Sequence, residues 1–191
     1  MTKERVTLYH YPLCPFSRKV RLCLFEKGVE HALQFEKPWE RRIDFLKLNP
    51  AGEVPVLVDV DGTVLSAHQA ICEYLNETRL GMDLLGDNPV FRAEVRRLMA
   101  WFDTLFYKEV YETLVDEKLL KQVQGKKEPD SVIIRAGRYN LKRHLKYVEW
   151  LAERRNYLAG AHISMADFDV AAHVSVLDYL GEIDWNAYPE T

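Results

Sequence analysis

The feature that most constrains the fold of this chain is a change of pattern near residue 80. Up to that point strand-like and helix-like segments alternate, and beyond it only helical periodicity is found. The stretch at 80–88 is rich in glycine, aspartate and asparagine and has little periodicity, which is typical of a linker. We therefore predict an α/β domain over residues 1–79 and an all-helical domain over residues 89–191.

The first domain is predicted to open with a strand, a helix and a second strand. Residues 5–10 have the pattern of a strand, Pro15 is well placed to begin a helix, and Gly28 is well placed to end it. Residues 32–35 form the second predicted strand. A unit of this length implies a parallel strand pair with a right-handed crossover.

The first domain is predicted to close with a hairpin and a helix. Residues 54–65 are rich in valine around Asp61-Gly62, which indicates two antiparallel strands and a tight turn. Residues 67–77 then return to helical character. The order of elements is therefore βαβ followed by ββα.

The second domain is predicted to contain three helical segments. The first two run over about 89–122 and 131–155, with Trp150 expected in the core, and the third opens at Ser164. Ser164-Met-Ala-Asp167 has the spacing of a capping box, with aspartate in place of the usual glutamate. Because the third helix carries few charges, we expect it to be the buried centre of the domain. The residues predicted to share its buried face are Phe168, Ala171, Ala172, Ser175 and Tyr179.

Charge and cysteine content exclude several classes of protein. The 26 basic and 29 acidic residues give a net charge of −3, which argues against nucleic acid as the main partner. No apolar run approaches the ~20 residues of a membrane span, and the N-terminus lacks the apolar stretch of a secretory signal. Three cysteines without CxxC spacing, Cys14, Cys23 and Cys72, favour neither a disulfide framework nor a structural zinc site. We expect a cytoplasmic protein without a bound metal.

Four motifs in order resemble the cytosolic glutathione S-transferase superfamily. They are Cys14-Pro-Phe-Ser-Arg-Lys-Val-Arg21, Leu48-Asn-Pro-Ala-Gly-Glu-Val-Pro55, Ala70-Ile-Cys-Glu-Tyr-Leu75 and Ser164-Met-Ala-Asp167. The resemblance implies a thioredoxin-like N-terminal domain followed by an all-α C-terminal domain, and a homodimer. Members of the superfamily usually continue for a further helix or two past the position of Thr191, so we expect the second domain to lack its final helix.

Cys14 is the candidate nucleophile. It lies just before the helix opened by Pro15, where unpaired backbone N–H groups and the positive end of the helix dipole favour a thiolate. The resemblance also leaves Ser17 open as a hydroxyl that could hydrogen-bond a glutathione thiolate, and Tyr9 or Tyr11 as a tyrosine-type alternative. In register, Cys14 falls where the superfamily keeps its catalytic group. The alternative is that Cys14 is a small loop thiol with no role.

The resemblance also predicts a glutathione cradle. The Val54-Pro55 step matches the cis-proline step that presents backbone N–H and C=O groups to the cysteinyl part of glutathione. Active members carry an acidic residue followed by serine or threonine before the third helix, and the matching positions here are Ala67 and His68. Ala67 offers no acceptor for the γ-glutamyl ammonium group, although His68 could still donate to the carboxylate.

These departures from the family pattern predict weak or absent glutathione binding. We expect that the protein requires no cofactor. Loss of one charge-assisted contact costs about 1.5–3 kcal/mol. Glu53 adds a like charge near the expected position of the glycyl carboxylate. Ser66 or Gln69 remains as a residue that could fill the gap.

Trp39, Arg41 and Arg42 are the candidate partner-binding residues. A tryptophan beside arginines in a charged, loop-like segment has the composition of a protein–protein hot spot. The other interpretation is that Trp39 tucks under its own loop.

Further stretches resemble an alphaproteobacterial cell-division branch of the superfamily. They are Glu36-Lys-Pro-Trp-Glu-Arg-Arg42, Leu114-Val-Asp-Glu-Lys118, Pro129-Asp-Ser131 with Arg135-Ala-Gly-Arg138, and Val176-Leu-Asp-Tyr-Leu-Gly181. This resemblance implies binding to filaments of the tubulin-like polymer FtsZ at the division site.

Two hypotheses of function follow. The first is an adaptor of FtsZ filaments with little or no catalytic activity. The second is an active glutathione transferase or glutathione-dependent thiol oxidoreductase that uses Cys14.

Overall fold

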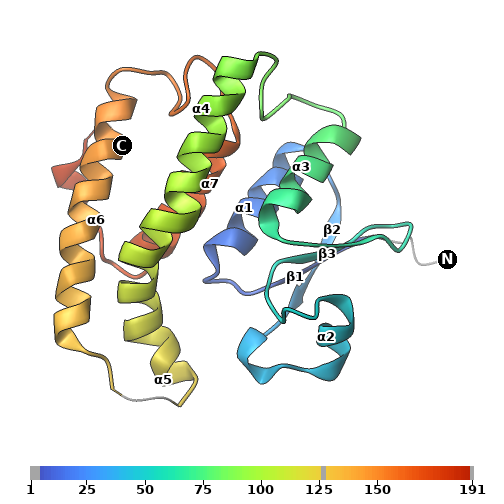
Figure 1. The fold of residues 1–191 in the computed structure, drawn as a ribbon, viewed down its shortest axis with the longest axis horizontal. Helices are drawn as coiled ribbons and strands as arrows, with labels where there is room; N and C mark the ends of the chain where they lie inside the picture. The colour runs from blue at the N-terminus through green and yellow to red at the C-terminus, as the bar shows by residue number, and fades with distance from the viewer. Residues whose placement is uncertain (1–4, 126–127, 190–191) are drawn as a thin grey trace. The chain divides into compact units, whose positions relative to one another are not determined.

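The computed structural model describes residues 5–125 and 128–189, and it divides into two compact units, Met1–Leu84 and Leu85–Thr191. The division falls inside the stretch 80–88 that the sequence predicts as a linker. The first unit is coloured from blue to green in Figure 1 and the second from green to red. Each unit has its own core.

The first unit is built on a mixed four-stranded sheet. The strands follow the order β2-β1-β3-β4, with β1 parallel to β2 and antiparallel to β3, and with β3 antiparallel to β4. The elements in chain order are β1 (Val6–His10), α1 (Pro15–Glu26), β2 (His31–Phe35), η1 (Pro38–Glu40), α2 (Ile43–Leu48), β3 (Val56–Val58), β4 (Val64–Ser66) and α3 (His68–Thr78). The predicted βαβ start and ββα finish are therefore confirmed.

The core of the first unit lies between the sheet and the helices α1 and α3, which contact each other. Leu8 of β1 and Leu57 of β3 are fully buried, as are Leu24 of α1 and Leu75 of α3. Burying a side chain of this size contributes roughly 1.5–3 kcal/mol. This packing holds the N-terminus of α1 at the end of β1, which is where the candidate thiol lies.

The regular secondary structure in the described part of the second unit is helical, apart from one isolated β-bridge between Tyr157 and Gly160. Figure 1 draws an unbroken helical ribbon from α4 to α5, in agreement with the single helix predicted over 89–122. Its middle part has the i→i+5 hydrogen bonding of a π-helix, a wider winding that the sequence pattern does not indicate. The elements are α4 (Pro89–Ala100), η2 (Trp101–Leu120), α5 (Lys121–Val123), α6 (Ser131–Ala152), α7 (Met165–Tyr179) and η3 (Trp185–Ala187).

Helix α7 is the buried centre of the second unit, as predicted. Its N-terminus has the predicted capping box, with the Asp167 carboxylate accepting hydrogen bonds from the Ser164 N–H at 2.8 Å and from the Leu158 N–H at 2.8 Å. The prediction that one face of α7 is buried was wrong, because Ala171 and Tyr179 of that face are exposed. Neighbouring helices cover α7 on several sides. Its side chains are therefore buried around most of the helix and not along one apolar stripe.

Two other expectations for the second unit were also wrong. Trp150 is 47% exposed instead of lying in the core, although its neighbour Leu151 is buried. Helix α6 ends at Ala152, a few residues before the predicted end at 155.

None of the helices in the described ranges combines the length and the apolar character that crossing a lipid bilayer requires.

Candidate functional site

Cys14 caps the N-terminus of α1. Its Sγ accepts a hydrogen bond from the Ser17 N–H at 3.4 Å, and its own N–H donates to the Tyr11 carbonyl at 3.0 Å. The side chain is half-buried, so solvent and small molecules can reach it. A backbone donor aimed at the sulfur, together with the helix dipole, stabilises negative charge there.

The Val54-Pro55 peptide bond is cis, as the resemblance implies. The Cys14 Sγ donates to the Val54 carbonyl at 3.8 Å, across forty residues of sequence. Val54 packs with Phe45 and Val56 in a small buried cluster that Tyr9, Tyr11, Cys14 and Leu48 border. The structure therefore brings the candidate nucleophile and the proline step together.

Ser17 has a structural position. Its side chain is fully buried, and its Oγ accepts a hydrogen bond from the Tyr11 N–H at 3.4 Å. A hydroxyl held in this way supports the loop between β1 and α1. Access by a ligand thiol would require this packing to open.

The start of α3 offers little to an ammonium group. Ala67 is the N-cap of α3 and makes no side-chain capping hydrogen bond. Its backbone has a φ of 68° and a ψ of 118°, a sparsely populated combination that costs a residue with a Cβ about 1–3 kcal/mol. His68 follows, and its imidazole stacks on the Phe16 ring of α1 with ring centroids 4.4 Å apart and planes 12° apart.

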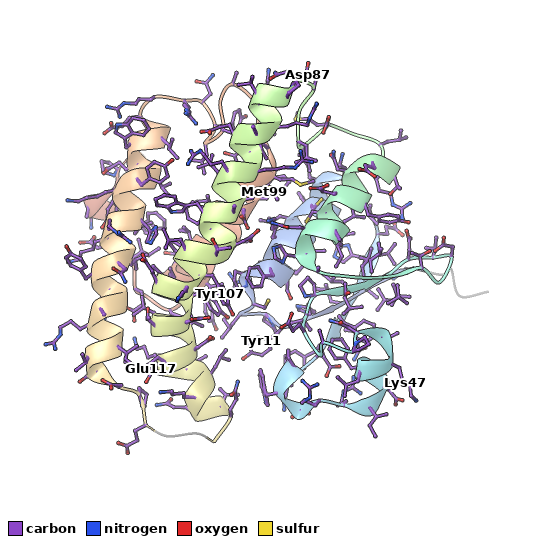
Figure 2. The ribbon with its side chains drawn as sticks, viewed as in Figure 1. Tyr11, Lys47, Asp87, Met99, Tyr107 and Glu117 are labelled. Atoms are coloured by element: carbon purple, nitrogen blue, oxygen red, sulfur yellow. The ribbon has the colours of Figure 1, made fainter. Side chains whose placement is uncertain are left out.

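The tyrosine alternatives lie beside the thiol. Burial raises the pKa of Tyr11, and the nearby charge of Lys37 opposes this rise, so the phenol is protonated at neutral pH. The Tyr9 ring packs against Phe45 with ring centroids 5.8 Å apart. Tyr11, labelled in Figure 2, borders the same buried cluster as Cys14 and also contacts Trp39, in the segment predicted to bind a partner.

The Trp39 segment adjoins the thiol site. The Trp39 ring is half-buried and meets Tyr11 edge-on, with centroids 5.1 Å apart and an interplanar angle of 83°. Arg42 is anchored by Glu36, whose side chain is buried and whose hydrogen bond raises the pKa of the guanidinium. Arg41 is exposed in a left-handed backbone conformation with a φ of 45°. Trp39 thus packs against Tyr11, which follows β1, and remains partly exposed.

A cluster in the helical unit was missed by sequence reasoning. The buried carboxylate of Glu182 pairs with Arg138 of α6 at 2.8 Å and with Lys118 of η2. These partners lie 44 and 64 residues away along the chain, so no local pattern could have joined them. The cluster brings together parts of the stretches that resemble the cell-division branch.

A second buried cluster contains Asp103 of η2 with Asp169 and His173 of α7. Their ligand-type atoms all lie within 4.8 Å of one another. The His173 Nε2 is 3.9 Å from Asp103 and 3.8 Å from Asp169, which are ion-pair distances and not hydrogen bonds. The cluster places an imidazole between two carboxylates inside the helical unit.

Comparisons with known proteins agree with this arrangement. The family model described as "Glutathione S-transferase, N-terminal domain" matches residues 13–78. The chain is 43% identical over 191 aligned residues to "FtsZ-localized protein A" of Caulobacter vibrioides, covering 98% of this chain and 83% of that protein.

Two solved structures share the fold over almost the whole chain. A glutathione S-transferase from Rhodospirillum rubrum F11 has a TM-score of 0.94 and 49% identity, covering 97% of this chain and 83% of that one. The structure "FzlA from C. crescentus" has a TM-score of 0.93 and 42% identity, covering 96% of this chain and 83% of that one.

Proposed function

The chain belongs to the glutathione S-transferase family, and from this premise we propose that it is an adaptor of FtsZ filaments in bacterial cell division, with little or no catalytic activity. The observation that carries the proposal is the similarity to FtsZ-localized protein A along 98% of the chain. The similarity extends over both units, and not only over the first unit that the family model matches, which favours a shared role.

The start of α3 supports a non-catalytic role. Ala67 replaces the acidic side chain expected for the γ-glutamyl ammonium group, and His68 is stacked on Phe16. Glu53 is exposed and adds negative charge on the glycyl side. Loss of the one charge-assisted contact at residue 67 weakens glutathione binding by roughly tenfold to a hundredfold, and the negative charge of Glu53 weakens it further.

The Trp39 segment supports a docking role. A half-buried tryptophan has little freedom to lose on binding, and tryptophan and arginine dominate the energy of many interfaces. The Arg42–Glu36 pair fixes the loop that presents the ring. The segment is therefore a pre-organised contact for the filament.

Co-sedimentation with polymerised FtsZ tests the proposal. We expect the wild type to pellet with filaments and Trp39→Ala to bind at least about tenfold more weakly, since a hot-spot truncation costs about 2 kcal/mol or more. Trp185→Ala is the matched control, because Trp185 is a partly exposed tryptophan of the other unit. A wild type that stays in the supernatant, or a Trp39→Ala variant that pellets like it, contradicts the proposal.

We further propose that the adaptor acts as a homodimer in the cytoplasm, at the division site. Family resemblance supports pairing, and two copies would let one molecule bridge two filaments. Sedimentation equilibrium should give twice the chain mass of 22.3 kDa. A mass of one chain at micromolar concentration would contradict the dimer and leave filament binding untouched.

A second function is favoured by one observation, the hydrogen bond from the Ser17 N–H to the Cys14 Sγ. A thiolate at this place can attack a glutathione disulfide, forming a mixed disulfide with one half and releasing the other as a thiolate. A dithiol reductant supplied in the assay would release the second glutathione as a thiol and restore Cys14, itself becoming a disulfide. Turnover of glutathione disulfide under these conditions that Cys14→Ser abolishes and Cys23→Ser preserves would establish this enzyme. The adaptor proposal predicts no such turnover.

A further inference from the structure

Helix α6 presents an exposed stripe of three cations and two aromatic rings. The residues Arg135, Tyr139, Lys142, Lys146 and Trp150 recur at spacings of four, three, four and four. At 3.6 residues per turn these positions share one face of the helix, and the stripe is roughly 22 Å long at about 1.5 Å per residue. All five side chains are exposed, and α6 is the orange helix in Figure 1.

The charge of α6 is strongly one-sided. The helix carries five lysine and arginine residues but one acid, Glu149. Two of the five cations are neutralised inside the unit, because Arg138 pairs with Glu182 and Arg143 pairs with Glu109.

The other three cations are the three of the stripe. Within the described ranges 5–125 and 128–189, Arg135, Lys142 and Lys146 form no ion pair. The chain as a whole has a net charge of −3, so this local excess of positive charge stands against the overall balance.

The aromatic residues of the stripe are also open. Tyr139 is 74% exposed and Trp150 is 47% exposed, with the Arg154 guanidinium 4.6 Å from the centre of the Trp150 ring. Tyrosine, tryptophan and arginine are the residues that most often anchor protein interfaces. Aromatic rings placed beside cations suit a polypeptide that offers both carboxylates and apolar side chains.

We propose that the α6 stripe, defined by these five residues, docks an acidic polypeptide segment of the FtsZ filament, an inference that rests on the proposed function. A lipid surface fits less well, because the apolar face of α6 that would insert is already buried, at Leu141, Leu145 and Val148. Nucleic acid fits less well because the stripe offers three cations along roughly 22 Å, whereas duplex DNA carries one negative charge about every 1.7 Å. Charge complementarity over the stripe makes the docking sensitive to salt.

Co-sedimentation with polymerised FtsZ at increasing salt tests the stripe. The test variant combines Arg135→Gln, Lys142→Gln and Lys146→Gln. The control combines Arg5→Gln, Lys47→Gln and Lys108→Gln, which are exposed cations outside α6. Both variants lose three positive charges, so a difference between them reports position and not net charge. Circular dichroism and thermal unfolding confirm that each variant is folded.

At low salt we expect the stripe variant to bind filaments about tenfold to a hundredfold more weakly than the control, with a flatter dependence of affinity on salt. Tyr139→Ser should weaken binding without changing that dependence. If the stripe and control variants bind filaments equally while Trp39→Ala fails to bind, the proposed docking at the stripe is contradicted. The proposed adaptor role is then still supported. A wild type that does not bind filaments would overturn both.

Parallel titrations with duplex DNA and with phosphatidylglycerol vesicles complete the test. Tighter binding of the wild type to either of these than to filaments, lost in the stripe variant, would overturn an acidic polypeptide as the occupant. Weaker binding to both supports it.

Discussion

At residue 67 a methyl group stands where the family resemblance places a carboxylate. The backbone there keeps a φ of 68° although no ligand-binding side chain needs it. A strained conformation of this kind is costly and is typical of functional sites. The proposed weak binding of glutathione would therefore arise from the side chain at this position and not from the conformation of the backbone.

Restoring that charge should restore glutathione binding. The double variant Ala67→Glu with His68→Ser supplies the acidic residue and the hydroxyl, and we expect glutathione to bind about tenfold to a hundredfold more tightly than to the wild type. Isothermal titration calorimetry measures this, with Ala67→Gln and His68→Ser as the neutral control. Equal affinity of the two double variants for glutathione would show that the missing negative charge at residue 67 is not what limits binding.

The carboxylate of Glu94 shows how a single residue can set acid sensitivity. Hydrogen bonds from Arg97 at 2.7 Å and from Arg155 at 2.7 Å outweigh partial burial and lower the pKa of Glu94 to about 2. The unfolded chain would protonate this group near its ordinary value of about 4.3. The stabilisation is therefore complete above that pH and is lost as the pH falls through about 2.

Glu94→Gln should flatten the acid response of the helical unit. Between pH 6 and pH 3 we expect the unfolding free energy of the wild type to fall by on the order of 1–2 kcal/mol more than that of the variant. Urea unfolding followed by circular dichroism at the two pH values measures the difference. Glu153→Gln, at an exposed ion pair, should behave like the wild type. Identical pH dependence in all three proteins would contradict the assignment.

At the scale of elements, α6 and η2 hold the helical unit together. The indole N–H of Trp101 donates to the His144 Nδ1 at 3.0 Å, so the proton of the neutral ring lies on Nε2, which donates to Glu109 at 3.0 Å. Burial lowers the pKa of His144, in agreement with this neutral form. The hydrogen bonds from Trp101 through His144 to Glu109 fix one register between η2 and α6.

Gly137 sets how closely α6 approaches η2. A Cβ added there would lie 2.3 Å from the Thr113 Oγ1 and 2.9 Å from the Leu114 Cγ. The Thr113 hydroxyl is itself held by the Glu109 carbonyl at 2.8 Å, so it cannot easily move away.

Gly137→Ala should therefore destabilise the unit by about 1–3 kcal/mol, although helix propensity alone would make it stabilising by about 1 kcal/mol. Thermal unfolding decides the sign. Ala136→Gly, at the exposed neighbouring position, reports the propensity effect alone. A higher unfolding temperature for Gly137→Ala would mean that the helices are not in close contact.

At the scale of the whole molecule, local patterns predicted the order of the elements well. The strand–helix–strand start, the Asp61-Gly62 hairpin and the Ser164 capping box depend on residues close in sequence, and all are present. The exposure of Trp150 and the burial around α7 were missed, because they depend on which neighbouring helices cover a face.

The candidate site also has some features that the sequence predicted and others that it did not. Cys14 at the start of α1 and the cis Val54-Pro55 bond could be read from motifs. The burial of Ser17 and the stacking of His68 on Phe16 could not, because both depend on side chains brought from other elements. The Glu182 ion cluster joins positions far apart in the chain and has no local signature.

The central claim is that this transferase scaffold serves as a docking surface and binds glutathione poorly. Calorimetric titration of glutathione into the full chain tests it most directly. We expect no saturable heat at sub-millimolar concentrations. Sub-millimolar binding, together with glutathione-dependent activity that Cys14→Ser removes, would contradict the claim.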